Sequence, residues 1–198
     1  SPAAGATRPN AIAFPVGYRW EFGGEKFEQD KGFHSLAIAL IVSFAAIAEA
    51  CFELGKRCGA TAMIFAMHQI QVVTLVRHAA KQPFFEEHLR RVAAEQRLIA
   101  SVTSEVGTGG DMGSSVAALT PAESGHTFTK QAPTVSYGAY ADDLLTTLRR
   151  DPKAKGGDQV AVLSRADQHR LDPQGTWDPF GMRGTCSPGY IVRAEFDT

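Results

Sequence analysis

Residues 104–115, "SEVGTGGDMGSS", hold four glycines and two acidic residues in twelve positions. Such a loop invites comparison with nucleotide-binding loops, but neither common pattern fits. A P-loop ends in Gly-Lys-Ser/Thr, and this stretch contains no lysine. A dinucleotide fingerprint needs a third glycine at position 112, where the chain has Met112. The loop therefore has another purpose, which the sequence on either side helps to define.

Upstream of the loop the sequence has the patterns of helices. We expect three, over residues 33–55, 61–80 and 84–96, and the second is apolar on nearly all sides, as in a helix enclosed by others. The third has one clear apolar face, made of Phe85, Leu89, Val92 and Gln96.

Downstream of about residue 99 the period changes to that of strands. Short segments rich in β-branched and aromatic residues are separated by Gly, Pro, Asp and Ser, as in antiparallel sheets or barrels. The predicted strands lie in 98–104, 114–120, 126–137, 141–150, 158–164 and 189–196. The pattern of 141–150 would also suit a short helix, but its paired threonines favour a strand. Helices followed by strands predict an α+β protein. We expect a helical bundle domain over 1–99 and a mostly antiparallel β-barrel domain over 100–198.

Composition narrows the function classes. The 198-residue chain has a net charge of −1 and no basic run longer than an arginine pair, which argues against nucleic-acid binding. The longest apolar run, 36–48, is shorter than the roughly 20 residues of a membrane-spanning helix. Residues 1–10 lack the pattern of a signal peptide. The three cysteines, Cys51, Cys58 and Cys186, have no CxxC or zinc spacing, so we expect reduced thiols, no metal and a cytoplasmic location.

Three motifs in a fixed order resemble one protein family. Residues 104–111 match the pattern Thr/Ser-Glu-x-x-x-Gly-x-Asp, through Ser104, Glu105, Gly109 and Asp111. Next come "KQAPTVSYGAYAD" (130–142) and "TWDPFGMRGTCS" (176–187), which is close to Trp-Asp-x-x-Gly-Met-Arg-Gly-Thr-x-Ser. Together they resemble the acyl-CoA dehydrogenase flavoproteins. Thr103, Thr108 and Gly110 depart from the residues usual at their positions.

The resemblance implies an N-terminal helical domain and a middle β-domain, without the C-terminal helical domain. It implies FAD as the cofactor, with FMN as the alternative, and α,β-oxidation of an acyl-CoA in fatty acid metabolism. The usual glutamate base belongs to the absent domain, so the catalytic residue is unknown and this chain alone is expected to turn over poorly. Family members form dimers or tetramers, so we expect a homo-oligomer or a partner that supplies the missing helices.

The same resemblance implies which residues hold the cofactor. Short hydroxyl side chains and backbone N–H groups suit the flavin edge, because they approach closely and can donate or accept. Glycine lets backbone approach without a Cβ in the way. The implied cofactor-binding residues are Thr103, Ser104, Gly109, Gly110, Thr134, Val135 and Ser136.

Other residues have competing interpretations. His68 is expected to be a core histidine with a satisfied ring, but related flavin monooxygenases have a similarly placed histidine near the site of oxygen activation. Glu105 is expected to hold the loop by accepting backbone hydrogen bonds rather than to act as the base. Trp177, Met182 and Arg183 are expected to stabilise a turn, with contact between Arg183 and a CoA phosphate as the alternative.

The helical segment 61–80 contains Met63, Phe65 and Met67 at helical spacing, a set expected in the core. For the whole chain, two rivals to the dehydrogenase remain. One is a reduced-flavin monooxygenase of the same fold, and the other is a truncated paralogue without catalysis.

Overall fold

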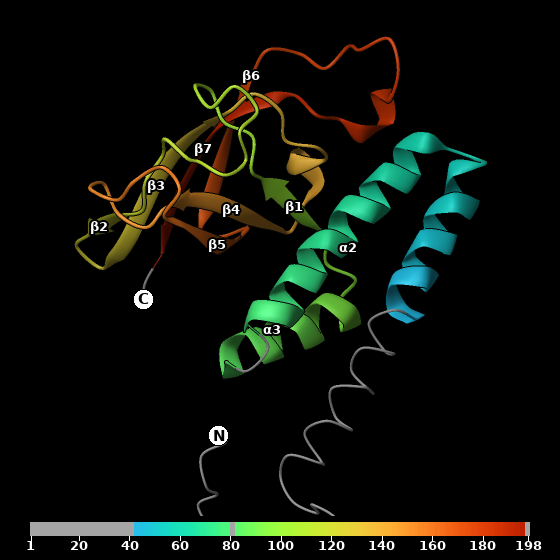
Figure 1. Cartoon of the computed structure of the whole chain (residues 1–198), viewed down its shortest axis with the longest axis horizontal. Helices are drawn as coiled ribbons and strands as arrows, with labels where there is room; N and C mark the ends of the chain where they lie inside the picture. The colour runs from blue at the N-terminus through green and yellow to red at the C-terminus, as the bar shows by residue number, and fades with distance from the viewer. Residues whose placement is uncertain (1–41, 80–81, 197–198) are drawn as a thin grey trace, which may run out of the picture. The chain divides into compact units, whose positions relative to one another are not determined.

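A computed structural model describes residues 42–79 and 82–196 (Figure 1). The start of the helix predicted from residue 33 lies outside these residues. Within the compact unit that begins at Ala45, residues 45–55 are helical and are followed by α2 (Gly59–Ala79) and α3 (Pro83–Ala94). All three helices stand where the sequence predicts them, and the first ends at Gly55 as expected.

Helix α3 is placed by its caps and by its apolar face. Pro83 occupies its first turn, where a missing N–H costs nothing. Gln96 has φ 53°, a left-handed conformation that stops the helix, and the N–H of Arg97 then bonds to the carbonyl of Val92 at 3.1 Å. Three of the predicted face residues pack in one cluster with β1, namely Phe85, Leu89 and Val92.

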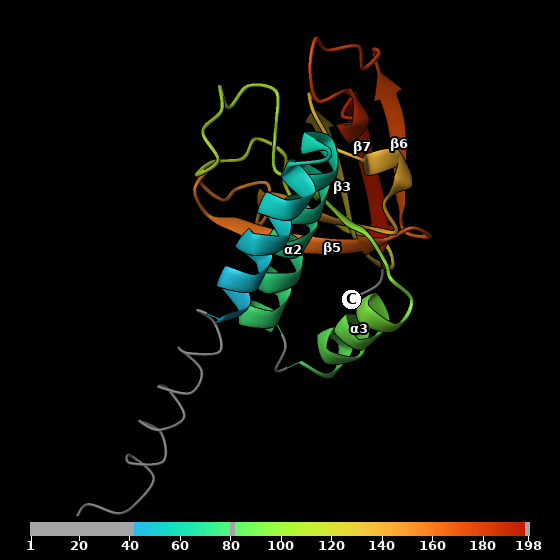
Figure 2. The same ribbon diagram turned by 90° about the vertical axis from the view of Figure 1, so that its right-hand side faces the viewer.

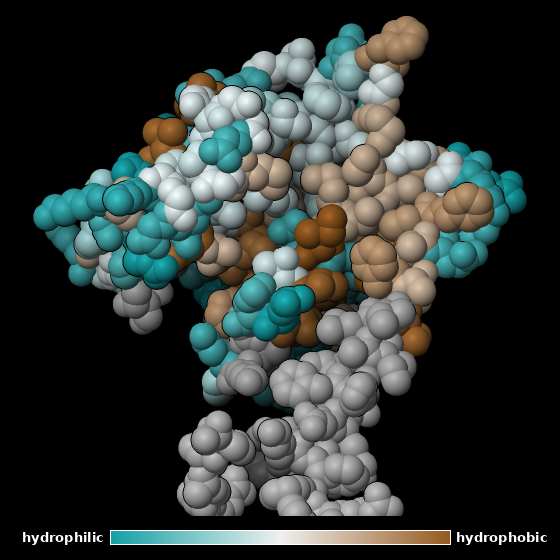
Figure 3. Space-filling model, viewed as in Figure 1, coloured by the Kyte–Doolittle hydropathy of each residue, from teal (hydrophilic) through white to brown (hydrophobic). Residues whose placement is uncertain are grey.

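Helix α2 is less enclosed than its sequence predicts. Leu75 is buried and Met67 packs against the core, but Met63, Ile70 and Val76 are 46%, 60% and 52% exposed. Figure 3 shows hydrophobic side chains gathered over the helices on this face. The prediction of a fully enclosed helix is therefore wrong for the described residues, and Met63 is not a core residue.

By length and composition alone, Gly59–His78 could cross a membrane. The same helix packs against β1 and α3, however, and carries the half-buried His68 and the buried Gln71. Within that helix, 17% of the apolar window is buried. In Figure 2 α2 runs alongside the strands.

Within the described residues, seven strands follow the helices and form two sheets. The first sheet has the order β1-β4-β5, with β1 parallel to β4, from Ile99–Val102, Asp143–Arg149 and Gln159–Arg165. The second is antiparallel in the order β2-β3-β7-β6, from Thr120–Ala122, Gly125–Ala132, Gly189–Phe196 and His169–Gln174. Strand β6 is the one that the sequence patterns miss, because "HRLDPQ" has no apolar alternation.

The predicted closed barrel is not formed by the described residues. Their strands pair within two separate sheets, and the one bridge between β4 and the chain entering β2 joins Ala118 to Arg149. The strand expected over 114–120 shrinks to a three-residue β2, because the N–H groups of Val116 and Ala117 bond to the carboxylate of Glu105. These two N–H groups are therefore not available for hydrogen bonds to a neighbouring strand.

The core lies between the two sheets and contains residues from both. Leu144 and Leu148 of β4 are fully buried, and Phe128 and Val192 of the second sheet pack in the same cluster. Helix and sheet regions belong to one compact unit from Ala45 onward. The division into domains 1–99 and 100–198 stays a prediction, although the change from helix to strand does fall at Ile99.

A buried ion cluster joins α3 to β4. Asp143 is fully buried, and the guanidinium of Arg97 donates to its two oxygens at 2.9 and 3.0 Å. The Nε2 atom of His88 lies 3.4 Å from the same carboxylate. Burial raises the pKa of Asp143, but the hydrogen bonds and charges of His88 and Arg97 lower it by a larger amount. The pKa therefore lies at about 2.

Tyr137 ties the chain after β3 back to β1. Its buried hydroxyl donates to the carbonyl of Ile99 at 3.1 Å, and burial raises its pKa to about 12. Tyr137→Phe is expected to lower the free energy of unfolding by about 1 kcal/mol, the usual worth of one buried hydrogen bond. Urea unfolding of both proteins measures this difference, and an unchanged midpoint would contradict it.

Candidate functional site

The two segments with predicted hydroxyl residues meet in space. Ser104 follows β1 and Thr134 follows β3, and the Ser104 Oγ donates to the Thr134 carbonyl at 2.5 Å. This bond spans 30 residues of sequence. The N–H of Val106 bonds to the carbonyl of Gln131 at 3.0 Å, which adds a second tie between the same segments. The start of the glycine loop is thereby fixed beside residues 133–136.

A hollow of about 280 Å³ lies at this junction. It is lined by Thr103, Ser104, Glu105, Thr108, Gly110, Asp111, Met112 and Pro133. Three predicted cofactor residues, Thr103, Ser104 and Gly110, are among them, and Pro133 adjoins a fourth, Thr134. Ser136 and Gly109 do not line it. The hollow combines hydroxyls with the apolar side chains of Met112 and Pro133.

Backbone donors are left free along the second segment. Among the residues that the structure describes, the N–H groups of Ser104, Thr134 and Ser136 have no hydrogen-bond partner. Val135, between the last two, differs: its N–H bonds to the carbonyl of Pro188 at 3.1 Å and its side chain is fully buried. A ligand edge that carries carbonyl or ring-nitrogen acceptors would suit the free donors. Val135 contributes core packing rather than a free donor.

The Ser136 hydroxyl belongs to a chain of hydroxyl groups. Ser187 Oγ donates to Ser136 Oγ at 2.9 Å and lies 2.7 Å from Thr185 Oγ1. Thr185 Oγ1 in turn lies 2.9 Å from the carbonyl of Met182, to which it can donate. The sequence placed Thr185 and Ser187 in a motif but gave no reason to select them. Only the fold brings that motif against Ser136.

Glu105 holds the glycine loop closed, as predicted. Its carboxylate accepts from Ser115 Oγ at 2.7 Å and from the N–H groups of Val116 and Ala117 at 3.1 and 2.5 Å. Burial raises the pKa of Glu105, but these hydrogen bonds and Lys130 outweigh burial, so the pKa lies below its usual value. A carboxylate held in this way is a poor proton acceptor, which agrees with the expected structural role of Glu105.

Lys130 is a buried residue that sequence reasoning missed. Its side chain is fully buried, and its Nζ lies 3.5 Å from Glu105 and donates to the carbonyl of Thr147 at 2.7 Å. Burial lowers the pKa of Lys130, while Glu105 opposes that shift. A lysine on a strand is usually a solvent-facing residue, and here its burial accompanies contacts with Glu105 and Thr147, which are distant in sequence.

The glycines give the loop its backbone shape. Gly109 and Gly110 have φ values of 61° and 90°, in the region that side chains disfavour, and a Cβ built on either would touch nothing within 4 Å. Glycine is thus required here by conformation. Close approach of a ligand to these two positions stays a prediction.

His68 lies on α2, where its Nδ1 accepts the N–H of Ile99 at 3.1 Å. Burial lowers its pKa below the ordinary value. A ring that accepts at Nδ1 is neutral, with its proton on Nε2. This is the satisfied core histidine expected from the sequence, and His68 does not line the hollow.

The loop over residues 176–187 forms the predicted turn. Trp177 Nε1 donates to the carbonyl of Arg183 at 3.1 Å, and the Arg183 guanidinium pairs with Asp178 at 2.6 Å. Met182 is 40% exposed and sits in the left-handed region at φ 58°. The turn packs on the start of α2, where Gly184 leaves only 3.1 Å between an added Cβ and the Cβ of Ala60.

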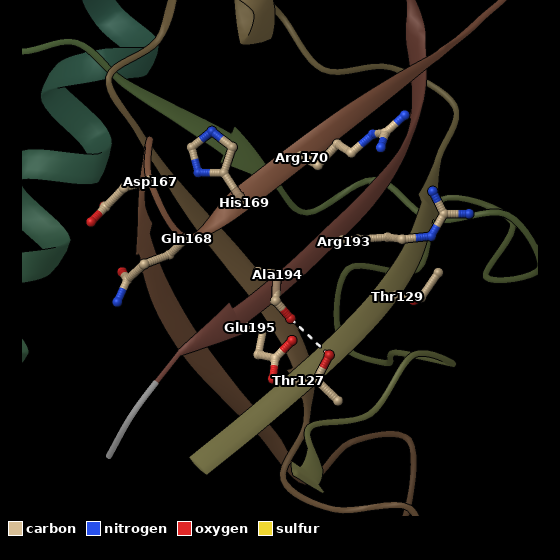
Figure 4. Close-up of a pocket in the computed structure, with 9 residues that line it drawn as sticks. All are labelled: Thr127, Thr129, Asp167, Gln168, His169, Arg170, Arg193, Ala194 and Glu195. Carbon is tan, nitrogen blue, oxygen red and sulfur yellow. Dashed lines mark hydrogen bonds between the residues drawn. The ribbon is translucent and has the colours of Figure 1, made fainter. Parts of the chain in front are cut away.

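A second hollow, of about 360 Å³, lies on the second sheet and is drawn in Figure 4. Arg170 of β6 and Arg193 of β7 stand opposite each other there, and both pair with the carboxylate of Asp172. Thr127 Oγ1 donates to the carbonyl of Ala194. Its two arginines are thus already paired with Asp172, and the hollow contains none of the predicted site residues.

The chain's sequence matches no protein-family model and no curated protein. Solved structures do match its fold. FMN-bound TdsC from Paenibacillus sp. A11-2 superposes with a TM-score of 0.61 at 22% identity, over 75% of this chain and 38% of that protein. Glutaryl-CoA dehydrogenase from Mycobacterium smegmatis superposes with a TM-score of 0.60 at 15% identity, over 75% of this chain and 38% of that protein. Acyl-CoA dehydrogenase from Geobacillus kaustophilus superposes with a TM-score of 0.50 at 14% identity, over 61% of this chain and 32% of that protein.

These matches confirm the resemblance at the level of fold. The chain has the α+β fold that acyl-CoA dehydrogenases have in their helical and middle domains, and flavin proteins such as TdsC share it. It spans little more than a third of the length of those proteins. At such low identity the likeness concerns the fold and not the reaction.

Proposed function

We propose that this chain is the flavin-binding part of an acyl-CoA dehydrogenase-like oxidoreductase, with FAD as its cofactor and an acyl-CoA as the compound oxidised at its α,β bond. The observation that carries the proposal is the bond from Ser104 Oγ to the Thr134 carbonyl. It brings two predicted cofactor-binding segments together beside a hollow that Ser104 lines, and Thr134 and Ser136 follow Pro133 at its edge.

The chemistry of these residues supports the proposal. The free N–H groups of Ser104, Thr134 and Ser136 and the hydroxyl of Ser136 form a set of donors, which suits a ring edge where negative charge grows on reduction. Bound flavin would supply the two-electron chemistry that no side chain can supply. The protein's part is to orient that ring and to hold Thr103 and Gly110 against it.

A second candidate is a reduced-flavin monooxygenase, which is favoured by the fold shared with FMN-bound TdsC. An anaerobic addition of acyl-CoA to the flavin-loaded chain, together with whatever supplies the remaining domain, separates the two. Loss of the oxidised-flavin absorbance favours the dehydrogenase. An unchanged spectrum, with oxygen-dependent turnover of another compound, favours the monooxygenase.

Partners and location follow as parts of the same proposal. A homo-oligomer or a second chain would complete the cofactor site, since the chain spans about 38% of the flavin proteins that it matches. The three free thiols, Cys51, Cys58 and Cys186, agree with a reducing, cytoplasm-like compartment. No nucleic-acid or membrane partner is included in the proposal.

Flavin titration tests the proposed function. Ser136→Ala is expected to weaken FAD binding about 2- to 10-fold, the worth of one hydrogen bond, and to shift the visible flavin spectrum. Thr129→Val, a change on the outer face of the second sheet, is the matched control and should leave both unchanged. An identical spectrum and dissociation constant for Ser136→Ala would remove this residue from the site.

A further inference from the structure

The hydroxyl chain behind Ser136 has a feature that the proposed function does not use. It begins at the half-buried Ser136, passes through Ser187 and Thr185, which are 2% and 4% exposed, and ends at the carbonyl of Met182. Each link is 2.7 to 2.9 Å long. The two buried hydroxyls lie one behind the other, so their hydrogen bonds connect Ser136 to Ser187 and then Ser187 to Thr185.

The backbone around the chain is held under strain. Tyr137, which follows Ser136, adopts a left-handed φ of 46°. Cys186, which lies between Thr185 and Ser187, adopts a left-handed φ of 44°. The N–H of Tyr137 bonds to the carbonyls of Thr185 and Cys186 at 2.7 and 3.1 Å. Strain of this kind persists only where surrounding contacts impose it, and it is concentrated at working sites. Here it keeps the hydroxyls in line.

The geometry gives one direction, in which Ser187 donates to Ser136, and rotation of the hydroxyl protons gives the reverse direction. Each hydroxyl has one proton to donate and can accept. In one direction Thr185 donates to Ser187 and Ser187 to Ser136, which leaves the Ser136 proton for an outside acceptor. In the other direction Ser136 accepts from an outside donor and gives its proton to Ser187. Ser187 then donates to Thr185, either to its Oγ1 or to its carbonyl 3.2 Å away, and Thr185 Oγ1 donates to the Met182 carbonyl.

A flavin ring needs both directions. Its N5 atom is a hydrogen-bond acceptor in the oxidised form and carries a proton, as a donor, in the two-electron reduced form. We propose that Ser187 and Thr185 are positioning residues that let the Ser136 hydroxyl donate to the oxidised ring and accept from the reduced ring. This inference rests on the proposed function, because it assumes that Ser136 contacts the flavin.

The two redox forms make the test specific. In Ser187→Ala the Ser136 hydroxyl can still donate to an oxidised ring, but it has lost the acceptor for its own proton when the ring is reduced. The dissociation constant of reduced flavin is therefore expected to rise about 3- to 10-fold, while that of oxidised flavin changes about 2-fold or less. The reduction potential of the bound flavin falls accordingly. Ser187→Thr keeps the hydroxyl and restores the wild-type ratio.

A double variant identifies Ser136 as the route of the effect. In a Ser136→Ala background, Ser187→Ala should no longer change the ratio of the two dissociation constants. Ser164→Ala, which truncates another buried serine, on β5, is the control for general loss of packing. If Ser187→Ala does not fold, Thr185→Val tests the same chain, and a shift of the ratio in the same direction is expected.

Three results overturn the inference. Equal weakening of both redox forms by Ser187→Ala would show a merely structural role, and so would an effect that persists without the Ser136 hydroxyl. In both cases flavin still binds, and the proposed function stands. If the wild-type chain binds neither FAD nor FMN in either redox form, the proposed function fails and the inference falls with it.

Discussion

Glu105→Ala is expected to lower the free energy of unfolding by about 3–5 kcal/mol, because it leaves the charge of Lys130 buried without its partner. Lys130 is fully buried and lies 3.5 Å from the carboxylate. The change also removes the acceptor of Ser115 and of two backbone N–H groups in the glycine loop. Urea unfolding followed by circular dichroism measures the loss.

Matched variants separate the charge from the hydrogen bonds. Glu105→Gln keeps an acceptor for the loop and is expected to lose less than the alanine variant. Glu105→Gln combined with Lys130→Met should be more stable than the sum of the single changes by about 1 kcal/mol or more. Glu53→Ala breaks only an exposed pair with Lys56 and should cost less than about 0.5 kcal/mol. A loss below about 1 kcal/mol in Glu105→Ala would contradict this role for Glu105.

The second large effect is expected at the joint between α3 and β4. Asp143→Asn keeps the size of the side chain but leaves Arg97 and His88 without a buried carboxylate. We expect a loss of about 2–4 kcal/mol at neutral pH, below the cost for a fully buried pair because Arg97 reaches solvent.

The pKa of Asp143 gives this effect a pH window. The folded-state pKa of about 2 lies below the ordinary value of 3.8, so the contribution is fully present above about pH 4 and is lost as pH falls through about 2. The stability difference between wild type and Asp143→Asn should therefore narrow between pH 4 and pH 2. Asp158→Asn, which breaks an exposed pair with Arg150, is the control and should show little difference at any pH. A stability difference between wild type and Asp143→Asn that stays constant down to pH 2 would contradict the lowered pKa of Asp143.

Much of the fold could be predicted because local signals agreed with the packing. Pro83 and the apolar face of α3 gave the helix, and alternation gave β4, β5 and β7. One failure came from a contact outside the local segment. Residues 114–119 have strand composition, but the carboxylate of Glu105 takes their N–H groups. The exposed face of α2 could not be told from a buried one, because its residues are apolar on both sides.

The candidate site was predictable in part for the same reason. Motif order pointed to Ser104 and Thr134, which the structure joins directly. It also pointed to Val135, whose side chain and N–H are both used by the core. Lys130 and Ser187 carry no local signal, since each owes its place to strand pairing or to a loop more than 20 residues away. Sequence patterns identify segments, and the fold decides which atoms remain free.

The central claim is that the backbone at Ser104, Thr134 and Ser136 forms the edge of a flavin site. An amide NMR titration of the chain with FAD tests it most directly, because it reports on these N–H groups one by one. The account predicts that their resonances shift as FAD binds, while those of Thr127 and Arg193, on the outer face of the second sheet, stay in place. Shifts confined to the outer face, or none at saturating FAD and FMN, would contradict it.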